Sequence, residues 1–322
     1  MYSYEKRREK TVKETKVITL TLNPAFDLHC SIEDFAPYQE CYAETLSVDA
    51  GGKGINISRA LKVNGTDSLA IVVVGAENAM EFCKMLNRDG MQYEEIWAEG
   101  RIRQNITLHE EDKPETRISF SGFQCDKKIL RKVNNRVEVN ENTIVTFTGS
   151  VPVGVSLDDV KELLHEFKKE GAKIVIDSRS FAMEDLLELK PWLIKPNRVE
   201  ATKYLGKSVQ TPEAAVEMAQ KFYEGGIENA VVSLGGGGAV MVCKEGTYHV
   251  KAPKCEVIST IGAGDSLVAG FITGATKGWL PQESLRLAVA CGTAACMTAG
   301  TRPPEKENID SIFAEIQVEK LA

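Results

Sequence analysis

The stretch "STIGAGDSLVAGF" (residues 259–271) joins a glycine-rich turn, one carboxylate and an apolar run. It follows the strand-like "CEVIST" and opens a helical pattern, so it predicts a strand–turn–helix unit. Gly262, Ala263 and Gly264 lie where the first turn of a helix leaves N–H groups free, and glycines allow an anion to approach them. Asp265 would then lie beside a bound phosphoryl group and accept a proton from an attacking hydroxyl. Taken alone, these residues are explained more simply by a helix N-cap role for Asp265.

The same unit recurs along the chain. Short apolar runs without alternation predict strands buried on both faces, at 17–23, 68–75, 142–149, 172–178, 192–197 and 230–236. Amphipathic patterns between them predict helices at 54–65, 77–90, 157–171 and 212–226. A hairpin is expected after residue 236, followed by helices at 263–277, at 281–298 and from about 306. This order predicts an α/β fold with a central, mainly parallel sheet flanked by helices.

Two regions, about 28–48 and 92–123, break this rhythm. They alternate polar and apolar residues, as in "IRQNITLHEED", which is typical of strands with one face in water. They predict a small separate sheet outside the main layer. Neither repeats nor a low-complexity linker interrupts the chain. We therefore expect one domain over residues 17–322, preceded by a flexible leader over residues 1–16.

Composition and charge exclude several classes of function. The net charge is −7 and no basic stripe is present, so neither nucleic acid nor a membrane surface is an expected partner. The eight cysteines form no C-x-x-C pair, which favours reduced thiols over a disulfide framework or a zinc site. The longest mostly apolar stretch, "LAVACGTAACMTAG" (287–300), is too short to span a membrane. With a charged start that does not look like a secretory signal, these features predict a cytoplasmic protein.

Three further stretches combine turn residues with functional side chains. In "DAGGKGINISRAL" (49–61), Lys53 lies among glycines at the start of a helix, which suits an anionic or hydroxyl-rich ligand or an ordinary structural turn. In "TLNPAFD" (21–27), a carboxylate after a strand end would bind sugar hydroxyls or serve as a turn aspartate. In "LIKPNRVE" (193–200), Asn197 and Glu200 read as a capping box or as groups near hydrated Mg²⁺ and phosphates.

Seven segments in this order resemble the PfkB branch of the ribokinase-like carbohydrate kinases. They are "TLNPAFD", "GGKGIN", "RQN", "TGSVPVGV", "LIKPNRVE", "VVSLGGGGA" and "TIGAGDSLVAGF". The resemblance runs over essentially the whole chain from Val17 and is closest to the phosphohexose kinases. It implies a ribokinase-like fold with a small β-sheet lid over 28–48 and 92–123. It also implies transfer of the γ-phosphate of ATP, with Mg²⁺, to a sugar phosphate, and a homodimer paired through the lid.

The resemblance implies roles for matched positions. Asp265 corresponds to the catalytic base, with Gly262, Ala263 and Gly264 as its anion hole. The positions matched to substrate binding are Asp27, Gly51, Gly52, Lys53, Asn56, Arg103 and Ser150, among which Lys53 and Arg103 correspond to contacts with the substrate's own phosphate. The positions matched to ATP binding are Lys195, Asn197, Ser233, Gly235 and Gly238. Glu200, together with Asn197, corresponds to indirect Mg²⁺ binding through water or phosphate.

The signal for the sugar phosphate is mixed. Lys53 matches the 1-phosphofructokinase pattern, whereas Gln104-Asn105 and Gly300-Thr301-Arg302 are more similar to minor 6-phosphofructokinases. The resemblance therefore implies fructose 1-phosphate as the preferred substrate, with tagatose 6-phosphate and fructose 6-phosphate as alternatives. A non-catalytic sugar-phosphate sensor is a remote alternative, because such a copy should have lost Asp265 or the adjacent glycines.

Overall fold

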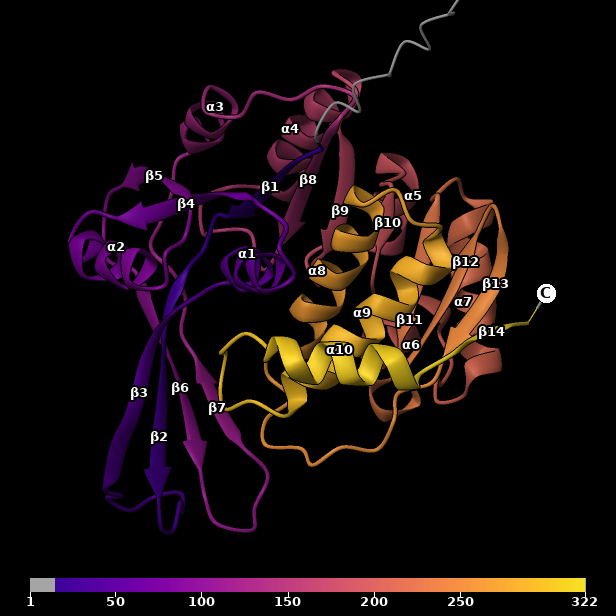
Figure 1. Cartoon of the computed structure of the whole chain (residues 1–322). Coiled ribbons are helices and arrows are strands. Elements are labelled where there is room, and N and C mark those ends of the chain that lie inside the picture. The colour runs from indigo at the N-terminus through magenta and orange to yellow at the C-terminus, as the bar shows by residue number, and fades with distance from the viewer. Residues whose placement is uncertain (1–14, 322) are drawn as a thin grey trace, which may run out of the picture.

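The computed structural model describes residues 15–321 (Figure 1). The leader expected over residues 1–16 therefore falls almost wholly outside the described residues, and Lys16 already begins β1. Among the described residues, no helix has the length and apolar character needed to cross a membrane.

The main layer is one large sheet. Within the described range it has ten strands, in the order β14-β13-β12-β11-β10-β9-β8-β1-β4-β5. Seven consecutive strands of this sheet pair in parallel, and they are β1 (Lys16–Thr21), β4 (Leu69–Gly75), β5 (Tyr93–Ala98), β8 (Thr143–Thr148), β9 (Lys173–Asp177), β10 (Leu193–Ile194) and β11 (Asn229–Ser233). One edge is antiparallel, with β12 (Ala239–Cys243), β13 (Gly246–Val250) and β14 (Val318–Lys320). Every residue of β8 is buried, as the absence of alternation predicts for a strand covered on both faces.

Helices cover both faces of this sheet (Figure 1). The sheet therefore separates the apolar core into two layers. One layer is packed by α1 (Lys53–Val63), α8 (Ala263–Thr276), α9 (Pro281–Cys296) and α10 (Lys306–Glu315). The opposite layer contains residues of α2 (Ala79–Arg88), α3 (Lys128–Asn134), α4 (Leu157–Lys169), α5 (Met183–Leu189), α6 (Arg198–Leu205) and α7 (Pro212–Glu224). The mainly parallel sheet flanked by helices is thus confirmed.

A second sheet of four strands projects from the main layer (Figure 1). Its order is β3-β2-β6-β7, from β2 (Ala25–Ile32), β3 (Ala43–Gly51), β6 (Arg103–His109) and β7 (Thr116–Ser119). The expectation that the whole segment 92–123 belongs to this sheet is wrong for β5. That strand pairs in parallel with β4 at the edge of the main sheet, because its residue Ile96 is buried in the main core.

Candidate active site

A cavity of about 820 Å³ opens at the carboxyl ends of the parallel strands, between the main sheet and the small sheet. Such crevices are where open α/β sheets bind ligands. It brings together all the predicted site residues except Gly51, namely Asp27, Gly52, Lys53, Asn56, Arg103, Ser150, Lys195, Asn197, Glu200, Ser233, Gly235, Gly238, Gly262, Ala263, Gly264 and Asp265. Segments 238 residues apart in sequence, at Asp27 and Asp265, therefore face one space.

Asp265 lies in the first turn of α8, at the bottom of this cavity. The N-cap of α8 is Gly262, with φ 81° in the left-handed region that favours glycine, so the N-cap role for Asp265 is wrong. The Asp265 carboxyl is 5% exposed and accepts a hydrogen bond of 2.9 Å from Asn56 Nδ2. A buried carboxylate beside free helix N–H groups is placed to meet an anion and a hydroxyl together.

Burial raises the pKa of Asp265 from 3.8 to about 6, and the negative charge of Asp177 adds to this rise. Lys53, the hydrogen bond from Asn56, and Lys195 act in the opposite direction. The group is therefore mostly ionised at pH 7 and has a pKa close to the operating pH. That combination suits a general base.

Two lysines and a second carboxylate form a buried cluster beside Asp265. Lys53 Nζ donates to the Asp177 carboxylate at 3.0 Å and to its backbone oxygen at 3.3 Å. Lys195 Nζ lies 3.4 Å from the other carboxylate oxygen of Asp177, and both these side chains are almost fully buried. Burial alone would lower the pKa of Lys53, but Asp177 and Asp265 outweigh it and raise the pKa. The cluster holds two fixed positive charges at the cavity.

The small sheet supplies a third carboxylate, Asp27. Its Oδ1 accepts hydrogen bonds from Asn105 Nδ2 at 2.8 Å and from Arg117 at 2.9 Å. Gly51 lies behind this group rather than in the cavity wall, and a Cβ there would come within 3 Å of the Asp27 carboxylate. Gly51 thus gives Asp27 the space it occupies.

Arg103 and Ser150 join neighbouring loops at the cavity. The Arg103 guanidinium donates to the backbone oxygens of Asn23 and Phe120, at 3.2 and 2.9 Å. Ser150 Oγ accepts from Asn23 Nδ2 at 3.0 Å. These bonds fix the turn between β1 and β2 against the small sheet, so Arg103 is oriented by its neighbours before any ligand arrives.

The opposite end of the cavity is built from glycines and a capped helix. Asn197 caps α6 through its side chain, and the Glu200 carboxylate accepts from the Asn197 N–H at 3.0 Å, so the capping box is confirmed. An isolated bridge pairs Asn197 with Ser233, at the end of β11. Gly238 has φ 83°, and a Cβ there would collide with the Val250 backbone oxygen. The backbone at Gly238 therefore lies directly against the backbone at Val250 at this end of the cavity.

Four charged residues of the cavity were not singled out from the sequence: Asp177, Arg117, Arg179 and Arg198. Asp177 ends β9, a strand that the pattern predicts, so its position at the carboxyl edge was a signal for it. Arg117 belongs to the alternating segment "ETRISF", whose spacing does not say which residue turns inward. Arg179 lines the cavity and is exposed, but it follows a strand in a short loop with no recognisable pattern.

Comparisons with known proteins agree with this geometry. The pfkB family carbohydrate kinase model matches residues 21–308. The 1-phosphofructokinases of Haemophilus influenzae and Bacillus subtilis are 32% and 30% identical, over 94% and 95% of this chain and 97% and 100% of theirs. The crystal structure of phosphofructokinase-2 from Escherichia coli in complex with substrates and products superposes with a TM-score of 0.88 at 28% identity, covering 93% of this chain and 99% of that one. The fold is ribokinase-like, and the chain belongs to the pfkB family of carbohydrate kinases, a family of phosphotransferases.

Proposed function

We propose that the protein is a 1-phosphofructokinase, which transfers the γ-phosphate of ATP to fructose 1-phosphate and yields fructose 1,6-bisphosphate and ADP. The observation that carries the proposal is the buried Asp265 at the N-terminus of α8, held by Asn56 beside a cationic cluster. The choice of acceptor is supported by the relatives named 1-phosphofructokinase over nearly the full chain.

In the proposed reaction, Asp265 accepts the proton of the acceptor hydroxyl as that oxygen bonds to the γ-phosphorus. The bond between the γ-phosphorus and the bridging oxygen breaks, and ADP leaves with the electron pair. Phosphoryl transfer needs mainly positioning and charge stabilisation. Here the free N–H groups at Gly262 and Gly264, the start of α8 at Ala263 and the ammonium group of Lys195 supply the positive potential.

The acceptor's own phosphate is assigned to the cationic side of the cavity. Lys53 faces the cavity with 38% of its side chain exposed, and Arg103 lines the same wall. Arg179 adds a third cation that the sequence interpretation did not include. Asp27, fixed by Asn105, is placed to accept hydrogen bonds from sugar hydroxyls. Three cations lining the cavity favour a phosphorylated acceptor over a neutral sugar.

The donor set fits a magnesium ion that comes with the nucleotide. Among residues 15–321, no group of three or more His, Cys, Asp or Glu side chains forms a metal cage. Glu200 lines the cavity beside Asn197, and Mg²⁺ is commonly held by one or two carboxylates, waters and substrate phosphates. When bound, the ion would neutralise charge on the transferred phosphoryl group. Glu200 would hold it through water, with Asn197 nearby.

The small sheet is proposed to act as a lid and as a dimer surface. It and its hairpins carry exposed apolar side chains, at Tyr38, Tyr42, Leu46, Ile118 and Phe120. Covering the cavity would exclude water and limit hydrolysis of ATP. Pairing with a second copy would bury this surface. Sedimentation analysis tests the pairing, and a monomer at micromolar concentration would contradict it.

The acceptor is tested by ADP release with MgATP and four sugars: fructose 1-phosphate, fructose 6-phosphate, tagatose 6-phosphate and fructose. We expect the highest kcat/KM for fructose 1-phosphate. A higher value for another phosphorylated sugar would change the substrate and retain the phosphate contacts. A preference for free fructose would overturn the role of Lys53 and Arg103. Absence of turnover with all four would contradict the proposed function.

We expect kcat to fall about tenfold per pH unit below pH 6, because the base must be ionised and burial raises the pKa of Asp265 to about 6. The acceptor's phosphate also titrates near pH 6, so the wild-type profile alone does not identify the group. Asn56→Ala removes a hydrogen bond that lowers the pKa of Asp265, and should move the acid limb to higher pH. An unmoved limb in this variant would assign the titration elsewhere.

A further inference from the structure

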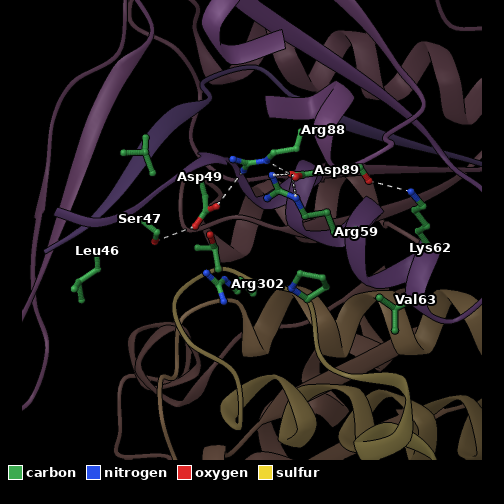
Figure 2. A pocket seen from close by; sticks show the side chains of 12 residues that line it. Leu46, Ser47, Asp49, Arg59, Lys62, Val63, Arg88, Asp89 and Arg302 are labelled. Atoms are coloured by element: carbon green, nitrogen blue, oxygen red, sulfur yellow. Dashed lines mark hydrogen bonds and ion pairs between the residues drawn. The ribbon is translucent and has the colours of Figure 1, made fainter. Parts of the chain in front are cut away.

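A second cavity, of about 810 Å³, lies beside the active site (Figure 2). Its walls come from β3, the second half of α1, the end of α2 and the loop at residues 301–303. The volume lies within the range of small-molecule sites. The proposed reaction uses no residue of this wall, and the two cavities share only Thr301 among their lining residues.

Positive charge exceeds negative charge in this wall. Four cations (Arg59, Lys62, Arg88 and Arg302) face two carboxylates (Asp49 and Asp89). The described residues that line this cavity therefore carry two more positive charges than negative charges. A protein with net charge −7 concentrates its cations here against its overall balance.

The contacts show which cations are free to bind a ligand. Arg59 is buried and paired with Asp89 through two guanidinium nitrogens. Arg88 is 60% exposed and lies 3.6 Å from Asp49. Lys62 Nζ donates to the backbone oxygens of Asp89 and Gly90, at 2.9 and 2.7 Å, and not to a carboxylate. Charge on this ammonium group is therefore not neutralised by its bonds.

Arg302 is the cation with the greatest freedom. It rises from the C-terminal loop on the opposite wall from Asp49 and Arg59 (Figure 2). Across residues 15–321, its guanidinium has no hydrogen-bond or ion-pair partner, and the residue is exposed. The adjacent Thr301 is 4% exposed, and its hydroxyl oxygen is buried without a hydrogen-bond partner. A buried, unsatisfied hydroxyl beside a free guanidinium is a pair of groups that an oxyanion would satisfy.

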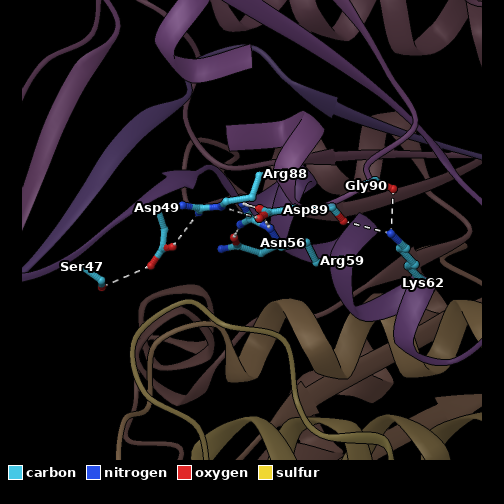
Figure 3. Close-up of polar contacts among 8 residues, drawn as sticks. All are labelled: Ser47, Asp49, Asn56, Arg59, Lys62, Arg88, Asp89 and Gly90. Carbon is cyan, nitrogen blue, oxygen red and sulfur yellow. Dashed lines mark hydrogen bonds and ion pairs between the residues drawn. The ribbon is translucent and has the colours of Figure 1, made fainter. Parts of the chain in front are cut away.

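One residue of this wall, Arg59, is hydrogen-bonded to Asn56 (Figure 3), which in turn donates to the proposed catalytic base. Arg59 Nη1 donates to Asn56 Oδ1 at 3.3 Å, and Asn56 Nδ2 donates to Asp265 at 2.9 Å. Because Arg59 occupies the amide oxygen of Asn56, the amide nitrogen is turned toward Asp265. Any ligand that draws Arg59 or Asp89 from their present pairing changes this orientation.

We propose that this cavity is a regulatory site for a phosphorylated small molecule, coupled to Asp265 through Arg59 and Asn56. The phosphate would be bound by the uncompensated charge of Arg302, with the Thr301 hydroxyl as a donor, while Lys62, whose ammonium group is bonded to backbone oxygens, would add to the positive potential of the cavity. Asp49 and Asp89 restrict where a negative group fits, which favours a single phosphate over a polyphosphate chain. The binding half of this proposal is independent of the proposed function, whereas the coupling half rests on it.

Binding is tested by calorimetry without turnover, at constant ionic strength. Inorganic phosphate, glucose 6-phosphate and AMP are titrated separately into the wild type, Arg302→Ala and Arg131→Ala, which together distinguish a free phosphate, a sugar phosphate and a nucleotide as the source. Arg131 is an exposed arginine on α3 outside both cavities, and so is the matched control. Since Arg302 does not line the active site, a difference between variants reports the second cavity alone.

Loss of one charge-assisted contact predicts about tenfold weaker binding of at least one probe to Arg302→Ala, with no change in Arg131→Ala. Equal binding of all three probes to the wild type and Arg302→Ala would overturn the site. Coupling is tested separately by the acid limb of kcat, which the bound probe should move in the wild type and not in Arg302→Ala. A limb that stays fixed while binding differs would overturn the coupling. Failure of every acceptor in the turnover assay would leave the binding comparison intact.

Discussion

Asp265→Asn should lower kcat by about 10²–10⁴-fold while leaving the affinity for ATP close to that of the wild type. The amide has nearly the same shape as the carboxylate but cannot accept the hydroxyl proton, and general-base catalysis contributes about this factor. The helix N–H groups and the lysine cluster remain in place, so binding of phosphates persists. Steady-state rates and equilibrium binding of ATP measure the two effects, and near-normal turnover would reject Asp265 as the base.

The same variant should unfold at higher denaturant concentration than the wild type at pH 7. The folded-state pKa of Asp265 is raised from 3.8 to about 6, so ionisation destabilises the native state increasingly as pH rises to 6. Removing the charge recovers on the order of 1–3 kcal/mol, because each pKa unit corresponds to about 1.4 kcal/mol. The gain should vanish below pH 4, where the carboxyl is protonated in both states.

Asp67→Asn is the matched control for this experiment. Asp67 is exposed and lies outside both cavities, so its replacement should change neither turnover nor stability. A loss of stability in Asp265→Asn would show that the carboxylate is held favourably and that burial does not dominate its pKa. Opposite changes in activity and stability would place Asp265 among functional groups that cost stability.

Periodicity in the sequence predicts the main sheet well because its strands are buried on both faces. The runs 68–75 and 142–149 became β4 and β8 within one residue at each end. The periodicity does not identify β5 as part of the main sheet. Its sequence "YEEIWA" carries two glutamates and is typical of a strand with one face in water. An edge strand of the main sheet has the same pattern as a strand of the small sheet, so only pairing distinguishes them.

Short helices α3 and α5 were also not predicted as elements, whereas α6 was anticipated through the capping box at its start. Each of the three has seven or eight residues, which is too few for a clear helical period. The site itself was anticipated through glycine-rich turns at strand ends. Its electrostatics were not, because the pairing of Lys53 with Asp177 joins residues 124 positions apart.

Asp177→Asn should be the most destabilising single change in the site. Lys195 and Asp177 are 4% and 2% exposed, and removing one partner of a buried pair costs about 3–5 kcal/mol of unfolding free energy. The Lys53–Asp177 pair contributes less to this loss of unfolding free energy, because 38% of the Lys53 side chain is exposed to solvent. Denaturant unfolding at pH 7 measures this effect. Stability equal to that of the wild type would mean that solvent or another group already compensates the lysines.

A second measurement separates this electrostatic cause from a general packing defect. Asp177 raises the pKa of Asp265, so Asp177→Asn should move the acid limb of kcat to lower pH even as the fold is weakened. Adding Lys53→Met should restore part of the lost stability, since one uncompensated charge is then removed. A packing defect would give additive losses and an unmoved limb. Recovery in the double variant together with a shifted limb would show that Asp177 sets both the charge balance of the site and the pKa of its base.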